Sequence, residues 1–338
     1  MQRTLPFHSN LITFGIPVLL ILSMVGLAYS SWFQSNPSEL ALGITFDLTL
    51  TIPIVYLILI WKKDIPKITA VPFYIAGLIV ASYVIPTQHQ QALSQIKQWV
   101  VPVVELGVFL FVVLKMRSLR IRFKAQQKTI PDFFSAMKEA SMEILPGKVG
   151  SFFAMEISTF YYGFFNWKKP AIKANQFTYH KESGSVALLY VVMLLVVVET
   201  AIIHLLVEQW SDLAAWILTG ISVYSGLQVF GMARSMDKRP ISLEDDHIHL
   251  KYGILAEAAI QYDNIADVEL SVKDLDEEDK SVRKLSPLGQ LESHNVLIHL
   301  KEEDTIHGLY GMKKTCKTLA LHVDDKDEFA KQLNELKG

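Results

Sequence analysis

Four ionisable residues lie within sequence that is otherwise apolar enough to cross a membrane: Asp47, Glu105, Glu199 and His204. A charge in hydrocarbon is costly and is rarely kept without a partner or a water-filled cavity. Carboxylates in such surroundings can exchange protons as burial and neighbours change, and carboxylates with an imidazole can ligate zinc, iron or manganese. These four residues are therefore the first candidates for a functional site.

Six apolar runs must position these residues. Each is long enough, at roughly 20 residues, to cross about 30 Å of hydrocarbon. With 51% hydrophobic residues the chain is too apolar for an ordinary soluble protein, and it is predicted to be a polytopic membrane protein. The runs cover approximately residues 11–31, 41–61, 69–86, 99–116, 184–207 and 211–233.

The distribution of Lys and Arg predicts the orientation of these runs. The connections 32–40 and 208–210 contain no basic residue, whereas the alternate connections and the stretch after residue 233 are rich in them. Because basic residues favour the cytoplasmic side, both termini should be cytoplasmic, as in a multi-pass protein of an inner (plasma) membrane. All four ionisable residues then fall in the outer half of the bilayer.

Their depths allow two interpretations. At a rise of 1.5 Å per residue, Asp47 and Glu105 lie about 9 Å inside the outer ends of their helices, Glu199 about 12 Å and His204 about 5 Å. A shared polar cavity open to the outside would keep them away from lipid. Tyr224 and Gln228 share a face of the sixth run at i,i+4 and could form a second shell of this cavity, or pair with a neighbouring helix. Alternatively, the polar residues are hydrated at the interface or hold helices together.

Sequence spacing gives little support to a metal site. Glu199 and His204 are five residues apart, about 140° around a helix, and so are not an i,i+4 ligand pair. The chain has no HExxH or CxxC motif, and its single cysteine, Cys316, excludes an internal disulfide. We therefore predict neither a metal nor another cofactor.

The segment between the fourth and fifth runs, residues 118–182, is predicted to be a cytoplasmic insert. Within it, residues 149–166 are apolar and aromatic but have basic residues on both sides, which favours an interfacial or re-entrant helix. Glu156, Tyr161 and Tyr162 lie on this helix, where membrane anchoring is the simple interpretation and a headgroup site the alternative. The basic stretch 115–128 adjoins a membrane helix and indicates contact with anionic lipid rather than with nucleic acid.

After residue 240 the hydrophobic period changes to two, which is typical of strands. We expect strands at 247–252, 254–260, 265–272, 295–301, 304–310 and 317–323, followed by an amphipathic helix at 325–337 that Asp324 would cap. This tail is acidic: residues 241–338 contain 21 acidic residues against 12 Lys and Arg, a net charge of −9.

The stretch ISLEDDHIHLKYGILAEAAIQYDNIADVEL resembles the start of bacterial pleckstrin-homology-like (PH-like) domains attached to membrane helices. There, two strands separated by a glycine turn lead into a Tyr-x-x-Ile step, here Tyr262-Asp263-Asn264-Ile265. The resemblance covers residues 240–338 and implies a mostly-β barrel with a C-terminal helix, used for assembly or regulation. It does not imply phosphoinositide binding in so acidic a domain. Lys313, Lys314 and Lys317 form a small basic group that we assign to a solvated loop.

The sequence thus predicts a bundle of six transmembrane helices followed by a small PH-like barrel. Its predicted parts are helices one to four (1–117), the insert (118–182), helices five and six (183–234) and the PH-like domain (240–338). The expected function is non-enzymatic: an outward-facing polar site for a proton, a cation or a small ligand, with partners limited to the bilayer and to itself or another protein through residues 240–338. The alternatives are a membrane-embedded metalloenzyme acting on a lipid or other apolar substrate, and a membrane scaffold.

Overall fold

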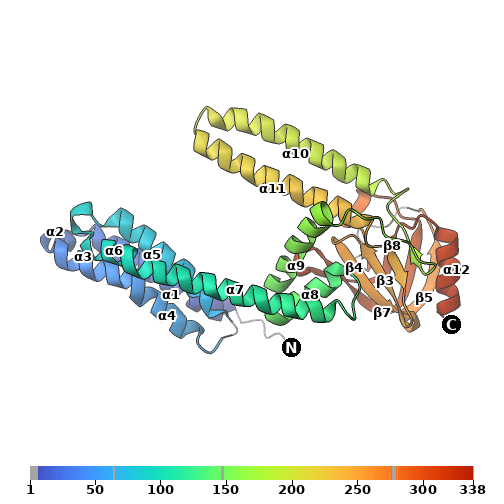
Figure 1. Ribbon diagram of the computed structural model, residues 1–338, viewed down its shortest axis with the longest axis horizontal. Coiled ribbons are helices and arrows are strands. Elements are labelled where there is room, and N and C mark those ends of the chain that lie inside the picture. Colours follow the sequence, from blue (N-terminus) through green and yellow to red (C-terminus); the bar gives the residue numbers. More distant parts are fainter. Residues whose placement is uncertain are drawn as a thin grey trace. The chain divides into compact units, whose positions relative to one another are not determined.

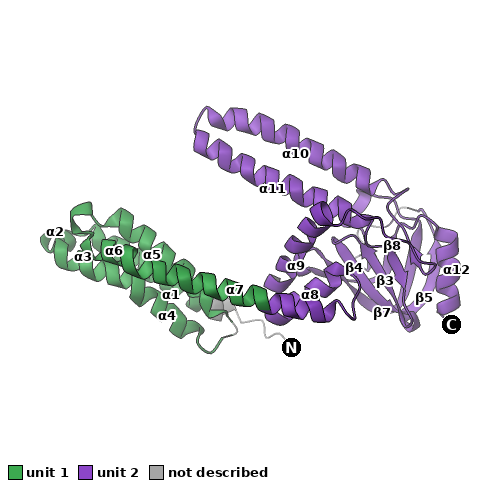
Figure 2. Cartoon of the chain, viewed as in Figure 1, with its two compact units in different colours: residues 1–117 green, residues 118–338 purple. Residues whose placement is uncertain are grey.

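The computed structural model describes residues 7–63, 65–145, 148–273, 275, 279 and 281–337, with side chains given from residue 11 onward except at 148. The chain divides into two compact units, Met1–Arg117 and Ser118–Gly338, which Figure 2 colours separately. Helix α7 (Val101–Gln126) continues from the first into the second.

Six helical segments in the described residues are long and apolar enough to cross a membrane, as the sequence predicts. Their number and order confirm the six predicted spans, and the fourth starts earlier than expected. The segments are Leu11–Ala28, Pro37–Ile60, Lys67–Val84, Gln91–Gln126, Ser185–Glu208 and Asp212–Met236.

The described part of the first unit is helical. Two π-helical turns, which close i→i+5 hydrogen bonds, interrupt its helices. The elements are α1 (Phe7–Ala28), α2 (Ser31–Ser35), α3 (Pro37–Phe46), the π-helical turn η1 (Asp47–Thr51), α4 (Ile52–Ile60), the short turn η2 (Lys67–Thr69), α5 (Ala70–Val84), the short turn η3 (Thr87–His89), α6 (Gln91–Gln95), the π-helical turn η4 (Ile96–Val100) and the start of α7.

The core of this unit forms where η1 meets α5. Ile44, Leu48 and Ile52 recur every four residues along α3, η1 and α4, and all three are buried. A side chain at Gly77 of α5 would place its Cβ only 1.9 Å from the backbone oxygen of Leu48. Glycine at this position is therefore what allows the two backbones to touch.

The second unit combines three kinds of structure: a pair of short helices, a long helical hairpin and a sheet (Figure 1). Helices α8 (Phe133–Ile144) and α9 (Lys148–Phe160) come first, and α9 continues into the π-helical turn η5 (Tyr161–Phe165). Helices α10 (Ser185–Glu208) and α11 (Asp212–Met236) form the hairpin, in which Ser211 caps α11 by accepting the N–H of Ala214.

The sheet has eight strands in the described residues, and neighbours follow the order β1-β2-β3-β4-β7-β8-β6, with β5 also paired to β7. All pairs are antiparallel except β6 with β8. This path leaves β1 and β6 at its two ends, so the pairing shows an open mixed sheet, and barrel closure stays a prediction. The strands are β1 (Gln176–Phe177), β2 (Ile241–Leu243), β3 (His247–Tyr252), β4 (Ala256–Gln261), β5 (Ile265–Leu270), β6 (Val282–Lys284), β7 (Val296–Gly308) and β8 (Lys313–Leu321).

The strands differ from the sequence prediction in two respects. The segments expected as two strands, 295–301 and 304–310, form the single strand β7, whose pairing with β8 shifts register between His299 and Asp304. Strands β1 and β6 were not predicted, because two or three residues are too few to show an alternating pattern. Through β1, the segment before the helical hairpin pairs with β2 and so belongs to the sheet.

The C-terminal helix α12 (Lys326–Leu336) is confirmed, and it buries Phe329 and Leu333 in the core of the sheet unit. Its predicted cap is wrong by one residue. The carboxylate of Asp325, not Asp324, accepts the N–H of Glu328. Asp324 instead accepts the backbone N–H groups of Lys181 and Glu182, 3.4 and 3.0 Å away, and so ties the segment before α10 to the end of the sheet.

Candidate functional site

Two of the predicted intramembrane residues belong to the first unit, and both lie close to a π-helical turn. Asp47 is the first residue of η1 and is half-buried, and Glu105 is exposed on α7, a few residues after η4. Neither carboxylate forms an ion pair with another described residue. π-Helical turns occur frequently at functional sites, which is compatible with the predicted role of these residues.

The other two belong to the second unit, where Glu199 is exposed on α10. His204 has a defined role in packing: its Nδ1 lies 2.8 Å from the hydroxyl of Thr219, and its ring packs edge-on against Trp216 with centroids 5.0 Å apart. Polar contacts of this kind hold membrane helices together. His204 therefore joins α10 to α11, and the convergence of all four residues on one cavity stays a prediction.

Tyr224 and Gln228, which were predicted to form a second shell of the intramembrane cavity, instead contact the carboxylate of Glu156. The hydroxyl of Tyr224 donates to Oε2 of Glu156 on α9, and Nε2 of Gln228 donates to the same oxygen at 2.5 Å. The Gln228 amide also lies 2.8 Å from the Tyr224 hydroxyl. Tyr310, in the turn η8 (Leu309–Gly311) between β7 and β8, donates to Oε1 of Glu156 at 3.4 Å. We call these four residues the Glu156 site.

Two glycines let α9 approach α11 closely enough to form this site. A Cβ on Gly231 of α11 would lie 2.3 Å from the backbone oxygen of Thr159, and a Cβ on Gly163 would lie 3.3 Å from the Cα of Gly231. Such small residues allow helix backbones to pack directly against each other. The aromatic segment predicted at 149–166 is therefore a helix that packs against the C-terminal half of α11.

A buried arginine joins α8, the end of α11 and the sheet. Arg239 is fully buried, and its guanidinium makes a two-point contact with the carboxylate of Asp132, with Nε and Nη2 at 3.0 and 2.8 Å from Oδ2. Nη2 also contacts Oε2 of Glu257 at 2.8 Å, while Nζ of Lys138 contacts Oε1 of the same carboxylate at 2.6 Å. Nη1 donates to the backbone oxygen of Gly253. We call Arg239, Asp132, Glu257 and Lys138 the Arg239 cluster.

The charges of this cluster keep its carboxyl groups ionised. Burial alone would raise the pKa of Asp132, but the charge and hydrogen bonds of Arg239 hold it well below its ordinary value. Burial also opposes ionisation of Glu257, whose pKa is lowered by contact with His249 and by the charges of Arg239 and Lys138. The cluster is therefore a buried ion-pair network that fixes the position of α8 and, through α8, that of α9.

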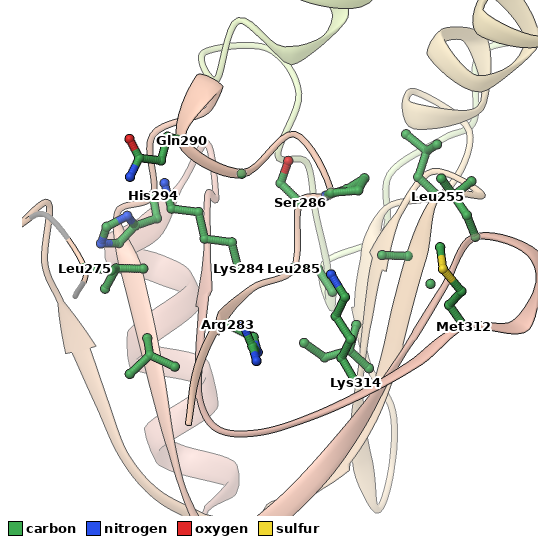
Figure 3. A pocket seen from close by; sticks show the side chains of 17 residues that line it. Leu255, Leu275, Arg283, Lys284, Leu285, Ser286, Gln290, His294, Met312 and Lys314 are labelled. Atoms are coloured by element: carbon green, nitrogen blue, oxygen red, sulfur yellow. The ribbon is translucent and has the colours of Figure 1, made fainter. Parts of the chain in front are cut away.

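A cavity with a volume of about 650 Å³ lies in the sheet unit (Figure 3). This volume falls within the range typical of small-molecule binding sites. Its inner wall is apolar and belongs to the core of the unit, with Leu255, Leu285 and Ile306 all buried. The remaining wall comes from β6, the loop after it, and the turn between β7 and β8. We call this cavity the β6 pocket.

The β6 pocket is lined by three basic residues, Arg283, Lys284 and Lys314. None of its described lining residues is acidic. Arg283 and Lys284 are on β6 and Lys314 is on β8 (Figure 3). Nε of Arg283 is buried and has no hydrogen-bond partner among the described residues. Nζ of Lys284 donates to the backbone oxygen of Glu292 at 2.8 Å. Within the described structure, Arg283 thus presents a donor without an acceptor next to an apolar wall.

A buried hydrogen bond fixes the loop that follows β6. The Tyr252 hydroxyl donates to Oε2 of Glu292, which is only 3% exposed. Burial, followed by the negative charge of Glu292, raises the pKa of Tyr252, so this phenol stays protonated. The loop therefore has a defined conformation on one side of the β6 pocket.

The β6 pocket was not found from the sequence. The expectation that Lys313, Lys314 and Lys317 lie in a loop is wrong, because all three are on β8; they are exposed to solvent as expected, and Lys314 lines the pocket. The one available signal was Arg283-Lys284, two adjacent bases in a strongly acidic stretch. Among the described residues, no group of three or more His, Cys, Asp or Glu side chains is placed to hold a metal ion.

Comparisons of the chain with protein-family models, with curated proteins and with solved structures find no match.

Proposed function

We propose that this chain is an integral membrane protein that binds, without catalysis, a small anionic amphiphile in the β6 pocket. The observation that carries the proposal is the composition of the pocket wall. In a tail of net charge −9, three of the 12 basic residues line one cavity that has no described acidic residue in its wall. Such a cavity favours a negatively charged ligand.

The wall also indicates what the rest of the ligand is. Arg283 and Lys314 can each donate charge-assisted hydrogen bonds to a carboxylate or phosphate, and arginine is well suited to both. The buried surface of Leu255, Leu285 and Ile306 fits an apolar chain rather than a sugar or a nucleotide base. A headgroup with one or two negative charges and a short acyl or alkyl chain satisfies both halves of the site.

The proposed setting follows from the sequence. The Lys and Arg bias supports a cytoplasmic sheet unit in an inner-membrane protein, and the strand order with a closing helix supports a PH-like domain with an assembly or regulatory role. Ligand binding by this domain would then signal the concentration of an amphiphile to the molecules that contact the membrane helices.

The test is calorimetric titration of the full chain in nanodiscs with octyl phosphate. We expect saturable binding of octyl phosphate. Octyltrimethylammonium, which has the same alkyl chain and the opposite charge, should bind more weakly. The double variant Arg283→Gln/Lys314→Gln should bind octyl phosphate at least about tenfold more weakly, because each charge-assisted hydrogen bond contributes about 1.5–3 kcal/mol.

The matched control is Lys313→Gln, a change at the neighbouring residue, which does not line the pocket. Its affinity should equal that of the unmodified chain. Equal affinity for the anionic and cationic probes, or undiminished binding by the double variant, would overturn the proposal.

A second proposal concerns the intramembrane residues and is favoured by the π-helical turns beside Asp47 and Glu105. We propose that Asp47 and Glu105 contribute to a polar site for a proton, a cation or a small ligand. Replacing each carboxylate by an apolar residue of similar size should abolish ion or ligand flux in proteoliposomes. Unchanged flux in the double variant would refute it.

A further inference from the structure

We propose that the Glu156 site binds a primary ammonium group, such as the headgroup of an ethanolamine phospholipid. This site is separate from the β6 pocket and calls for the opposite charge. The proposal rests on three observations: a carboxylate that has no cationic partner among the described residues, a neighbouring buried amide carbonyl that has no donor among them, and exposed aromatic rings around the carboxylate.

The first observation is the charge of Glu156. Its carboxylate accepts hydrogen bonds from Tyr224, Gln228 and Tyr310, all of which are uncharged donors. None of the ion pairs among the described residues includes Glu156. By contrast, the carboxylates of the Arg239 cluster in the same unit each have a cation within 3 Å. This half-buried carboxylate, on a helix packed against a membrane span, thus has hydrogen-bond donors but no counter-ion in the described part of the chain.

The second observation is the amide of Gln228, which is only 6% exposed. Its Nε2 donates to Glu156, and its Oε1 belongs to the same terminal amide group. Oε1 is buried and has no hydrogen-bond partner among the described residues. A buried carbonyl normally has a donor, and its absence calls for an explanation. A ligand with N–H groups would supply one.

The third observation is the aromatic surround. Phe152, Tyr224 and Tyr310 are 49, 44 and 36% exposed, and the rings of Phe152 and Tyr310 stack with centroids 5.1 Å apart. Exposed ring faces attract cations. Tyr310 has φ +53°, a left-handed conformation that costs energy for a residue other than glycine and persists where the surroundings impose it. The turn η8 therefore holds this tyrosine against Glu156 at a conformational cost.

Together these groups select a primary ammonium ion. It would neutralise Glu156, donate to Oε1 of Gln228 and lie against the aromatic rings. A quaternary ammonium could do the first and the last but has no N–H for Gln228, and an anion could do none of them. The exposed apolar side chains that continue along α9 and η5, Ile157, Phe164 and Phe165, provide a surface for the acyl chains of a lipid.

The test is native mass spectrometry of the full chain in detergent, with phosphatidylethanolamine, phosphatidylcholine and phosphatidylglycerol of identical acyl chains. We expect the ethanolamine lipid to bind about tenfold more tightly than the glycerol lipid. Glu156→Gln should reduce this preference to within about twofold. The matched control is Glu139→Gln, which removes an exposed carboxylate from the neighbouring helix α8 and should leave the preference unchanged.

A second variant guards against misfolding of Glu156→Gln. Phe152→Leu removes one exposed ring and no hydrogen bond, and it should weaken binding of the ethanolamine lipid several-fold without lowering the unfolding temperature. Free ethanolamine at millimolar concentration should compete if the ammonium alone is recognised, and it should fail to compete if the acyl chains contribute. Equal binding of all three lipids, or an unchanged preference in Glu156→Gln and Phe152→Leu, would overturn the proposal.

Discussion

Replacing Arg239 by Met tests whether the Arg239 cluster holds the second unit together. Methionine keeps most of the volume and removes the positive charge. Asp132 would then lose its ion pair, and Glu257 would keep only its contact with Lys138. Breaking a buried ion pair in this way costs about 3–5 kcal/mol, because the carboxylate of Asp132 stays desolvated after its partner is removed. For a unit of roughly 200 residues, in which each kcal/mol shifts the midpoint by about 2–4 °C, the unfolding temperature should fall by about 6–20 °C.

The assay is thermal unfolding of the detergent-solubilised chain, followed by tryptophan fluorescence and by limited proteolysis of residues 118–338. Arg122→Met is the matched control, because Arg122 pairs with Glu143 at 3.4 Å while both side chains are exposed to solvent. An exposed pair contributes at most about 1 kcal/mol, so its loss should shift the midpoint little. An Arg239→Met variant that is as stable as Arg122→Met would refute the reasoning.

Three further predictions concern the same unit. Because the pKa values of Asp132 and Glu257 are lowered in the folded state, their contribution to stability is complete above about pH 5 and is lost as the pH falls below about 4. The unfolding temperature should therefore fall between pH 7 and pH 3, and it should fall less in an Asp132→Asn variant. Gly231→Leu should separate α9 from α11 and expose α9 to protease, whereas Gly226→Leu on the same helix, where the space around the glycine is open, should not. Burial raises the pKa of Cys316 to about 11, so iodoacetamide at pH 7.5 should alkylate this thiol roughly a hundredfold more slowly in the folded chain than after denaturation.

Much of the helical architecture follows from the sequence alone. The membrane spans are runs of about 20 apolar residues, a signal that requires no knowledge of the tertiary structure. The same holds for β3, Gly253 and β4, where the alternation of residues 247–252 and a glycine with φ +51° indicate a hairpin. The C-terminal helix was predictable from its apolar face, although its cap was not, because the backbone of Lys181 and Glu182 competes for Asp324.

The candidate sites could not be predicted in the same way, because they join segments that are distant in sequence. Glu156 meets Gln228 and Tyr310, which lie 72 and 154 residues further along the chain. Hydrophobic periodicity indicates which face of a helix is buried, not which element covers it. The β6 pocket depends in addition on a strand of three residues that pairs in parallel with β8, and no local pattern announces such a pairing.

Photocrosslinking tests the central claim, that the β6 pocket binds an anionic amphiphile, most directly. An octyl phosphate analogue with a diazirine at the end of its chain would be irradiated with the full chain in nanodiscs, and the labelled peptides identified by mass spectrometry. We predict adducts on peptides that contain Leu255, Leu285 or Ile306, suppressed by excess octyl phosphate and lost in Arg283→Gln/Lys314→Gln. Labelling confined to the membrane helices, or unaffected by the competitor, would contradict the account.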